Sequence, residues 1–566
     1  MSKIKPERTA VKEILNGFAG IGPNGLSTGK AVDMRNFRLL SNGSLEKRCG
    51  WEIRNRMSGY VRAVWQGAMD DTNCIFVVCS ETIYRLANGE QTIVGMLTET
   101  PQHAEFVFYL GYLYLFEDNG LHVYRENLDR FETAKGYAPL FGVNWHPTQY
   151  GETNEPLNIC SMRLRVNYLN TEGATTFTLP FYAKSIDCLR VDNVRTSDFT
   201  FKTGERQVTV SKIGTVVEIA FTLRTPWDLY TSLRQCNRAR VERFGDRETL
   251  MAYGDPTGTN LFCSSTVDSN MLNYCLVAYP DTDPLYVKTN NVVTVGDPLH
   301  PMTALCRHHD RMLAFHALGA AAVIPSPDSD AVEYYPLLRG VGCTATIDLR
   351  WNGDAIILNA DGIFRLTGTA GEPDEIILSR LSEGVEHMLT KSFLTNAIAF
   401  SNPLHGELWF RDTRDSTGLV WVYQMAQKQW YCFDGIKADY FLSLDGDSCF
   451  VSETSICRFD NALKTDDGTP FIAYWQSGVL ALSSPEAVKR ALRVTLCAQQ
   501  GGNITRVSLK TERIEKTVSI QNQPGGVPLL LDSRVPLGRF RLLQVRISDS
   551  GVNRSRYDRL ALYANA

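Results

Sequence analysis

The sequence of 566 residues has no run of about 18 apolar residues, so we expect no helix that crosses a membrane. Residues 1–8 do not lead into the apolar core of a secretory signal, and we therefore expect the protein to be made and folded in a cytoplasm. The fourteen cysteines never form a Cys-x-x-Cys pair. Several lie in apolar, strand-like runs, which favours buried free thiols over zinc binding or disulfides. Examples are Cys74, Cys188, Cys449 and Cys497.

Motifs that would indicate catalysis are absent as well. The sequence contains no Gly-x-Ser-x-Gly and no phosphate-binding glycine loop, and Gly340-Val-Gly342 follows no βαβ unit. A glycosidase needs two carboxylates beside the scissile bond, but each acidic pair lies in a turn-like stretch, where Asp bonds to its own backbone. These pairs are Asp328/Asp330, Asp412/Asp415 and Asp445/Asp447. We therefore predict no catalytic residues and no enzyme.

One histidine cluster, His308-His309-Asp310, is the candidate for a metal site, with His300 and His316 nearby. Adjacent residues of a strand point to opposite faces of a sheet, so His308 and His309 do not converge on one ion. The surrounding sequence is typical of a hairpin turn. We therefore predict no bound metal and no cofactor.

A short phrase recurs along the chain: an apolar strand, a tight turn and a second apolar strand that carries an Arg. It occupies residues 74–86, 112–125, 355–366 and 449–459. The pairs Asn119-Gly120 and Asp361-Gly362 are typical of two-residue hairpin turns with positive φ. We interpret the arginines of the four copies as strand-end partners of neighbouring repeats. They are Arg85, Arg125, Arg365 and Arg458.

The spacing of this phrase predicts the architecture. Arg85 and Arg125 are 40 residues apart, and Arg365 and Arg458 are 93 apart, about two units of the same length. Repeats of about 40 to 50 residues, each with four short strands, are typical of propeller blades. We predict an all-β protein built on a β-propeller of six to eight blades. Trp421, Trp430 and Tyr431 are then the hydrophobic filling of one blade.

The repeat is interrupted, and the interruption predicts further domains. Residues 158–224 alternate apolar and polar side chains over five or six short strands, which indicates an inserted β-sandwich. We predict an N-terminal arm with a short helix at 9–18, a propeller in two parts, the insert between them and a C-terminal β-sandwich-like domain. The predicted ranges are 1–32 (arm), 33–150 and 229–462 (propeller), 151–228 (insert) and 463–566 (C-terminal domain).

Charge is unevenly distributed along the chain. The whole sequence carries −4, but residues 486–566 contain 14 Lys and Arg against 6 Asp and Glu, which is a net +8. A basic C-terminal domain on a weakly acidic body indicates an acidic partner surface or nucleic acid. Solvated arginines on the outer face of alternating strands are the alternative.

The segment from Asp33 to Trp51 contains Asn-x-Arg, Gly-x-Leu and Lys-Arg-x-Gly in succession. It resembles the N-terminal stretch of the β-propeller tail nozzle or tail-hub family of short-tailed bacteriophages and prophages, which includes packaged-DNA stabilisation proteins. Cys49 stands where that group usually has Pro, which loosens a turn. The matching residues are Asn36, Arg38, Gly43, Leu45, Lys47, Arg48 and Gly50, and similar segments lie at 235–240, 254–260, 474–475 and 485–490.

The resemblance implies a structural virion protein of the tail, assembled in the cytoplasm of a host bacterium. It implies a ring of identical subunits, commonly a hexamer, that extends the head-to-tail connector and gates or conducts DNA during ejection. Its partners would be the adaptor or portal ring and tail fibre or distal tail proteins, and DNA would cross the lumen without sequence specificity. It implies no catalytic, cofactor-binding or metal-binding residue.

Two other functions remain open. A propeller glycosidase that acts on host surface polysaccharide would need a carboxylate pair in a central funnel. A carbohydrate-binding adhesin would need exposed aromatic residues on the inserted sandwich. Tyr168 and Phe181 are the candidates there, although their alternation with polar residues favours burial.

Overall fold

The computed structural model describes residues 10–23, 29–69, 72–326, 332–345, 347–368, 376–482, 484–499, 504–521 and 529–565. Strands make up 56% and helices 5%, which confirms the all-β prediction. The chain forms two compact units. The first holds Met1–Met57, Cys306–His308 and Cys343–Ala566, and the second holds Ser58–Leu305 and His309–Gly342. No helix among the described residues is long and apolar enough to cross a membrane.

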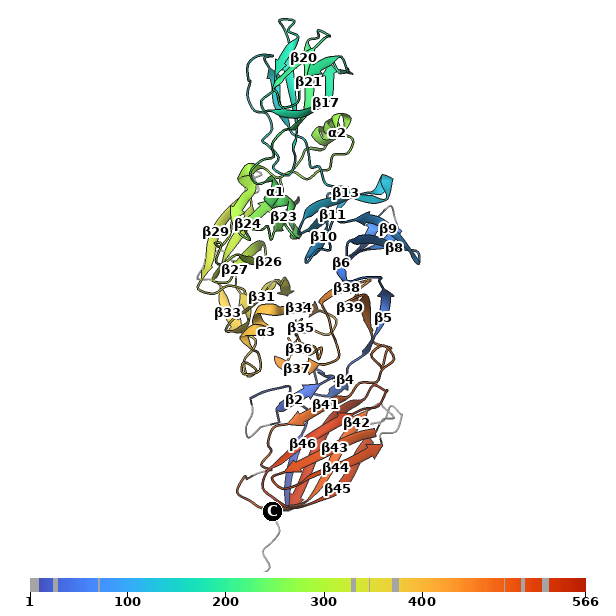
Figure 1. The fold of residues 1–566 in the computed structure, drawn as a ribbon. Coiled ribbons are helices and arrows are strands. Elements are labelled where there is room, and N and C mark those ends of the chain that lie inside the picture. Colours follow the sequence, from blue (N-terminus) through green and yellow to red (C-terminus); the bar gives the residue numbers. More distant parts are fainter. Residues whose placement is uncertain are drawn as a thin grey trace, which may run out of the picture. The chain divides into compact units, whose positions relative to one another are not determined.

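Four four-stranded sheets lie mainly in the second unit, among its described residues (Figure 1). The first strands of three of them, β6, β10 and β22, lie side by side in that order. The strands are β6 (Val61–Met69), β7 (Thr72–Cys79), β8 (Thr82–Ala87), β9 (Glu90–Met96), β10 (Ala104–Tyr109), β11 (Tyr112–Glu117), β12 (Gly120–Arg125), β13 (Arg130–Thr133), β22 (Arg238–Phe244), β23 (Arg247–Tyr253), β24 (Asn260–Cys263), β25 (Val292–Thr294), β26 (Met302–His308), β27 (Arg311–His316), β28 (Gly319–Pro325) and β29 (Val332–Arg339).

The first unit contains three further groups of four strands. Their first strands, β30, β34 and β38, again lie side by side. The third group takes its fourth strand, β5 (Gly50–Arg56), from the N-terminal part of the chain. The others are β30 (Leu349–Trp351), β31 (Asp354–Asn359), β32 (Gly362–Thr367), β33 (Ile377–Arg380), β34 (Ala397–Asn402), β35 (Glu407–Asp412), β36 (Val420–Gln424), β37 (Gln429–Phe433), β38 (Tyr440–Leu444), β39 (Asp447–Ser452) and β40 (Ser455–Asp460).

The four repeated phrases form antiparallel hairpins, as predicted: β7–β8, β11–β12, β31–β32 and β39–β40. Two turns lie one residue earlier than predicted, because Glu117 pairs with Gly120 and Asn359 pairs with Gly362. Each glycine therefore opens the second strand. Gly120 does not have positive φ, and a Cβ there would lie 2.8 Å from the ends of the Glu117 and His122 side chains, which would have to shift to admit a larger residue.

The inserted domain consists of two sheets around one apolar core, within the second unit. Its larger sheet also includes β14, which precedes the predicted start of the insert at 151, and α2 packs beside this sheet (Figure 1). Its elements are β14 (Leu140–Trp145), β15 (Arg163–Leu169), β16 (Thr176–Thr178), β17 (Ala183–Val191), β18 (Val194–Arg195), β19 (Phe199–Phe201), β20 (Gln207–Val210) and β21 (Val216–Leu223), with the helices α1 (Tyr230–Arg234) and α2 (Ser269–Ala278) following.

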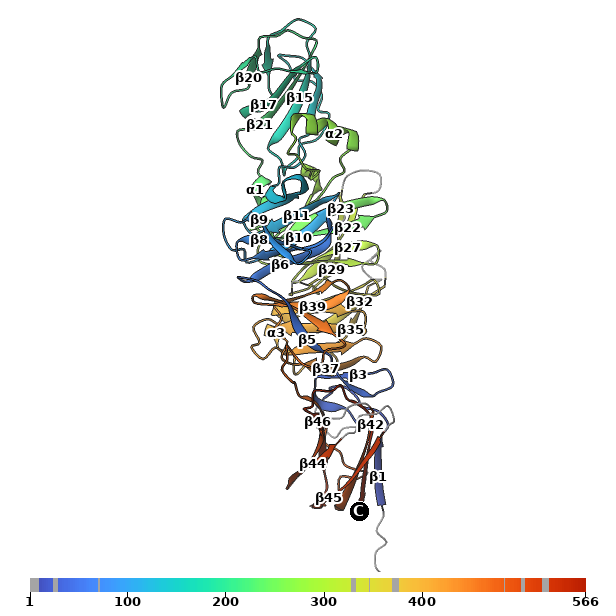
Figure 2. The same ribbon diagram turned by 90° about the vertical axis from the view of Figure 1, so that its right-hand side faces the viewer.

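The C-terminal strands form two layers in the first unit (Figure 2). One layer has the order β3-β4-β47-β42-β45, and the other continues the sheet of β34–β37 through β2-β41-β46-β43-β44. The strands are β2 (Ala31–Arg35), β3 (Phe37–Leu39), β4 (Leu45–Lys47), β41 (Ala473–Ser477), β42 (Lys489–Gln499), β43 (Ile504–Thr511), β44 (Glu515–Gln521), β45 (Leu529–Phe540), β46 (Leu543–Asp549) and β47 (Arg556–Asn565).

The predicted N-terminal helix is wrong. Ala10–Leu15 form a strand, β1, which pairs antiparallel with β47 from Ala10↔Asn565 to Leu15↔Leu560. The local sequence suits either conformation, so pairing with the free edge of a distant strand decides the outcome. The short helices outside the inserted region are α3 (Lys391–Asn396), η1 (Glu126–Leu128) and η2 (Thr289–Asn291).

Candidate functional site

The predicted acidic pairs bond to their own turns and strands. Asp412 accepts bonds from Arg414, and Asp415 accepts bonds from the backbone N–H groups of Thr417 and Leu419. Asp445 pairs with Arg54, and Asp447 lies 3.6 Å from Arg458. Asp328 and Asp330 lie outside the described residues.

His308 is a buried structural histidine. Its Nδ1 accepts a bond from the Ala355 N–H (3.2 Å), and its Nε2 donates to the Gly368 carbonyl (2.8 Å). Both ring nitrogens of His308 therefore have hydrogen-bond partners within the chain. His309 has φ 52° in the turn that follows β26 and is exposed.

The fourteen cysteines are free, and all but the partly exposed Cys497 are buried. Burial raises the pKa of the Cys263 thiol to about 12 and that of Cys343 to about 11, with hydrogen bonds to the backbone partly offsetting the effect at Cys343. Such thiols behave as small apolar side chains. Trp421, Trp430 and Tyr431 are also buried, in β36 and β37.

The residues that carry the family resemblance fold into a joint, which we define as Asn36, Arg38, Lys47 and Arg48 with their partners. The segment that contains them crosses several sheets of the first unit in succession: β2 pairs with β37 and β41, β4 pairs with β47, and β5 pairs with β40. A segment of about twenty residues therefore ties the sheets of the first unit to the C-terminal strands.

Arg38 forms a buried ion pair at the joint. Its Nε donates to Glu407 Oε1 (2.7 Å), and both side chains are nearly inaccessible to water. Burial alone lowers the pKa of Arg38, but the Glu407 carboxylate more than offsets it and holds the pKa above its ordinary value. Glu407 also accepts bonds from Trp409 Nε1 and the Tyr431 hydroxyl, each at 2.8 Å. The carboxylate is thus fully satisfied inside the protein.

Arg48 connects three segments through its guanidinium group. Nε donates to Asn36 Oδ1 (2.9 Å), Nη1 to Asp466 Oδ1 (2.8 Å) and Nη2 to the Asp434 carbonyl (3.1 Å). Its Cζ lies 3.9 Å from the ring centroid of Phe471. Asn36 has φ 57°, a conformation that Asn tolerates better than most residues, and its amide donates to the Ile472 carbonyl (2.8 Å).

Lys47 and Gly50 complete the joint. Lys47 Nζ donates to the Gly551 carbonyl and lies 3.8 Å from Asp549, and burial lowers the pKa of this amine. A Cβ at Gly50 would lie 1.9 Å from the Thr465 carbonyl oxygen, so no larger residue fits there. The polar residues of the motif thus bond within the chain. The motif builds structure and is not a ligand site.

His405 adds a pH-sensitive group beside this joint. Burial, together with the nearby Arg38 and Arg554, lowers its pKa to about 4, although Glu407 opposes the shift. Because an unfolded His titrates near 6.5, the unfolded chain binds the extra proton between about pH 6.5 and 4, so stability falls as pH decreases through that window.

We expect His405→Gln to reduce the pH dependence of the free energy of unfolding, measured by urea unfolding from pH 7 to 4.5. His146→Gln, at an exposed site, is the control, and parallel wild-type and His405→Gln profiles would contradict the expectation.

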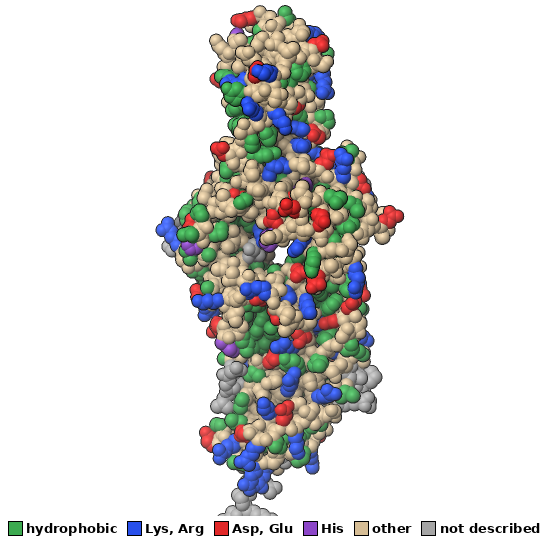
Figure 3. Space-filling model, in the orientation of Figure 1, with side chains coloured by type: hydrophobic (Ala, Val, Ile, Leu, Met, Phe, Trp, Pro, Cys, Tyr) green, Lys and Arg blue, Asp and Glu red, His purple; other side chains and the backbone are tan. Residues whose placement is uncertain are grey.

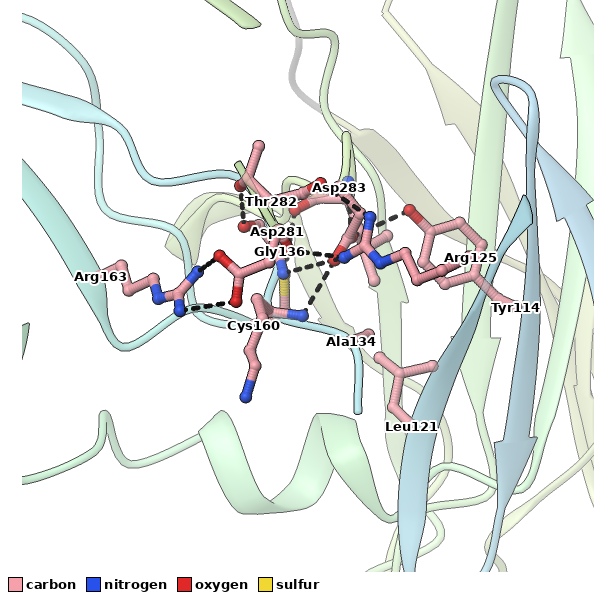
Figure 4. A network of polar contacts seen from close by, with 12 residues as sticks. Tyr114, Leu121, Arg125, Ala134, Gly136, Cys160, Arg163, Asp281, Thr282 and Asp283 are labelled. Atoms are coloured by element: carbon pink, nitrogen blue, oxygen red, sulfur yellow. Dashed lines mark hydrogen bonds and ion pairs between the residues drawn. The ribbon is translucent and has the colours of Figure 1, made fainter. Parts of the chain in front are cut away.

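A second buried network, centred on Asp283, anchors the inserted domain within the second unit (Figure 4). Asp283 has no exposed surface, and its Oδ2 accepts bonds from the backbone N–H groups of Lys135 and Gly136, each at 2.9 Å. Its Oδ1 accepts a bond from the Tyr114 hydroxyl (2.9 Å). One carboxylate therefore ties β11, the entry of the insert and the segment after α2 together.

Arginines complete this anchor. Arg125 at the end of β12 donates to the carbonyls of Asp281 and Thr282 and lies 3.7 Å from Asp283. Arg163 at the start of β15 makes a bidentate pair with Asp281 (2.6 and 3.0 Å; Figure 4). Arg125 of β12 and Arg163 of β15, which belong to different sheets, thus both bond to the loop at residues 281–282. These contacts indicate that the insert is fixed to the sheet of β10–β13 and is not a freely tethered module.

The strand-end arginines are only partly as predicted. Arg85 bonds to Asp129 (2.8 Å) in the loop of the next sheet, as expected, but Arg365 pairs with Asp354 and Arg458 with Glu52, each within its own sheet. Arg125 belongs to the anchor of the insert. The antiparallel register brings these carboxylates beside Arg365 and Arg458, which local sequence does not reveal.

The basic C-terminal strands present a polar face on β41, β46, β43 and β44. A hollow of about 150 Å³ on this face is lined by Gln476, Ser508, Lys510, Glu515, Gln544 and Arg546. The Arg546 guanidinium lies 3.8 Å from the ring centroid of Tyr474, whose hydroxyl donates to Asp33 (2.6 Å). Figure 3 shows Lys and Arg interspersed with Asp and Glu on the visible surface. Arg493 pairs with Asp532 within these strands, and Arg554 pairs with Glu46 from the N-terminal part of the chain, which offsets one of the excess positive charges.

Comparison with known proteins gives no family. No family model and no curated protein match the chain. Among solved structures, the AfRom2 CNH domain matches with TM-score 0.34 and 8% identity over 73% of this chain and 97% of its own. The extracellular domain of a one-component system from B. thetaiotaomicron matches with TM-score 0.25 and 11% identity, over 92% of this chain and 81% of its own. An exo-β-1,3-galactanase from Phanerochaete chrysosporium matches with TM-score 0.20 and 6% identity, over 97% of this chain and all of its own. Likenesses this weak carry no functional argument.

Proposed function

We propose that the seven groups of four strands in the described residues are the blades of one β-propeller, and that the chain is a structural protein of a bacteriophage tail. Within each unit, the first strands of three successive sheets lie side by side, which supports an arrangement of blades around an axis. The sheet of β38–β40 is completed by β5, so strands from the two ends of the repeat region share one sheet. Such a shared sheet ties the last blade to the beginning of the ring.

The observation that carries the tail assignment is the joint. The residues that resemble the tail nozzle and tail-hub motif are buried and bonded within the chain. A motif that bound a soluble ligand would leave hydrogen-bond donors accessible to it. The donors of this motif instead bond to other residues of the chain and hold neighbouring sheets together. Buried ion pairs add little net stability over apolar packing, but they specify geometry, which suits a component of a rigid assembly.

In this role the protein forms a ring with copies of itself, commonly a hexamer, between the adaptor or portal ring and tail fibre or distal tail proteins. DNA crosses the lumen without sequence-specific contacts, and the acidic body of the chain limits phosphate binding there. The polar C-terminal face with Lys510 and Arg546 is a candidate surface for an acidic partner. The protein is located in the virion tail, after assembly in the cytoplasm of the host bacterium.

Assembly tests this proposal. We expect sedimentation velocity and negative-stain microscopy of the full chain to reveal rings, either alone or on addition of portal–adaptor rings. The basis is that a closed propeller leaves only short, protected strand edges and so packs laterally without aggregation. A protein that remains monomeric and does not bind the portal–adaptor rings would overturn the tail role. Cleavage of host polysaccharide would favour a glycosidase instead.

A further inference from the structure

The inserted domain exposes aromatic residues, but not those that the sequence indicates. Tyr168 is fully buried and its hydroxyl donates to the Thr178 carbonyl (2.8 Å), and Phe181 packs against Phe141 and Trp227. Tyr150 and Tyr182, by contrast, are 54% and 59% exposed. Large aromatic side chains left on a surface mark candidate interaction sites when they are grouped.

Tyr150 and Tyr182 are grouped around one arginine. Tyr150 lies in the loop after β14, Tyr182 immediately precedes β17, and Arg206 immediately precedes β20. The Arg206 Cζ lies 5.2 Å from the ring centroid of Tyr150 and 5.9 Å from that of Tyr182. Three segments separate in sequence therefore place two exposed rings beside one guanidinium group.

Backbone bonds hold these three segments together. The Leu179 N–H donates to the Arg206 carbonyl (2.7 Å), the Ala183 N–H to the Glu205 carbonyl (3.1 Å) and the Thr178 N–H to the Pro147 carbonyl (2.8 Å). Arg206 Nε donates to the Leu179 carbonyl (2.8 Å). The arginine is thus fixed by its Nε, which leaves the Nη atoms available to a ligand.

The ring of Tyr150 packs against the buried Trp145. The two rings meet edge to face at 5.3 Å between centroids, and the Trp145 indole N–H donates to the Glu152 carbonyl (2.9 Å). A Cβ at Gly151 would lie 2.4 Å from the Trp145 ring, so the backbone is pressed against it. The aromatic surface is therefore preorganised, which lowers the entropic cost of binding.

Arg206 lies beside both rings. Within the described residues no carboxylate forms an ion pair with Arg206, while Glu205 pairs with Lys202 (3.0 Å). Arg224 belongs to the same region: its backbone N–H donates to the Tyr182 carbonyl (2.9 Å), and its Nη1 would lie 2.9 Å from a Cβ at Gly204. An exposed aromatic surface with two arginines suits a ligand that has an apolar face and an anionic group.

We propose that Tyr150, Tyr182 and Arg206 form a binding site for an acidic saccharide. The C–H face of a pyranose ring stacks on the exposed tyrosines, and a carboxylate of the sugar accepts the Nη donors of Arg206 in a bidentate pair. The site is separate from the joint and does not depend on the tail role. Because a guanidinium group also binds phosphate in a bidentate pair, a sugar phosphate is one of the comparison ligands in the test.

The test uses the full chain in isothermal titration calorimetry with glucuronate-containing oligosaccharides. Their carboxyl-reduced counterparts and a sugar phosphate are the comparison ligands. We expect the acidic oligosaccharide to bind at least tenfold more tightly than either, and we expect Tyr182→Ala and Arg206→Gln each to weaken it at least tenfold. Tyr60→Ala is the matched control, since Tyr60 is 54% exposed and has Arg62 5.7 Å from its ring, and within the described residues no other tyrosine ring lies beside the Arg62 guanidinium.

Unchanged circular dichroism and melting temperature establish that the variants are folded. Equal binding of the carboxyl-reduced or phosphorylated sugar, undiminished binding by Arg206→Gln, or no binding of any of the three ligands would each overturn the proposal. A loss with Tyr60→Ala equal to that with Tyr182→Ala would overturn it as well. None of these results depends on ring formation, so this test and the assembly test fail independently.

Discussion

Replacing Arg38 by Met is expected to lower the free energy of unfolding of the first unit by about 3–5 kcal/mol. The substitution keeps an unbranched side chain but removes the guanidinium group, and so leaves the Glu407 carboxylate, 1% exposed, without a counter-charge. The bonds from Trp409 and Tyr431 remain but do not compensate for a buried anion. Urea unfolding followed by tryptophan fluorescence at pH 7 measures the change.

Two controls separate loss of charge from loss of packing. Arg458→Met removes an arginine of the same unit whose pair with Glu52 is 33% and 43% exposed, and we expect a change of less than about 1 kcal/mol. Arg38→Met combined with Glu407→Gln removes both charges and should recover more than half of the loss. Equal destabilisation by Arg38→Met and Arg458→Met would show that the buried pair has no special role.

Replacing Asp283 by Asn should release the anchor of the inserted domain. Oδ1 accepts bonds from the Tyr114 hydroxyl and the Leu285 N–H, and Oδ2 accepts bonds from two backbone N–H groups. The NH₂ group of Asn cannot accept a hydrogen bond, so in either orientation it would be placed against donors. Arg125, 3.7 Å away, also loses its counter-charge. We expect a loss of about 3 kcal/mol, because buried donors are left unsatisfied.

Hydrogen exchange and limited proteolysis localise this effect. The variant should exchange faster and be cleaved at 134–160 and 279–288, the two segments that Asp283 joins. Asp281→Asn is the matched control, because its side chain is 44% exposed and its pair with Arg163 lies nearer to solvent, so we expect about 1 kcal/mol or less. Protection of both segments in Asp283→Asn at the wild-type level would contradict an anchoring role.

Local patterns predicted the strands well, because the alternation of apolar and polar residues and the turn residues are signals contained within a few neighbouring positions of the sequence. The repeated phrases at 74–86 and 449–459 form the expected hairpins, and the alternating residues of 158–224 form the sheets of the insert. Turn positions were less predictable: Glu117 pairs with Gly120, so the turn consists of Asp118 and Asn119, and Gly120 follows it. The predicted helix at 9–18 is wrong because Ala10–Leu15 pair with a strand at the opposite end of the sequence, and no local pattern reveals that partner.

The candidate sites depend on contacts that no local pattern contains. Arg38 and Glu407 are 369 residues apart, and the sequence marks Arg38 only through the family resemblance. Tyr150 and Tyr182 lie outside strands, where no periodicity distinguishes exposed from buried side chains, whereas the alternation around Tyr168 correctly favoured burial. No sequence signal would have singled out Arg206.

The sequence by itself determined the all-β class, the repeated hairpins and the presence of an inserted set of strands, since these follow from alternation and turn chemistry over short distances. Only the tertiary structure decided that the motif residues are buried in ion pairs, that Asp283 holds the insert and that two tyrosines flank an arginine on the surface. Burial, pairing and exposure are set by which distant segments meet, and that is a property of the folded chain.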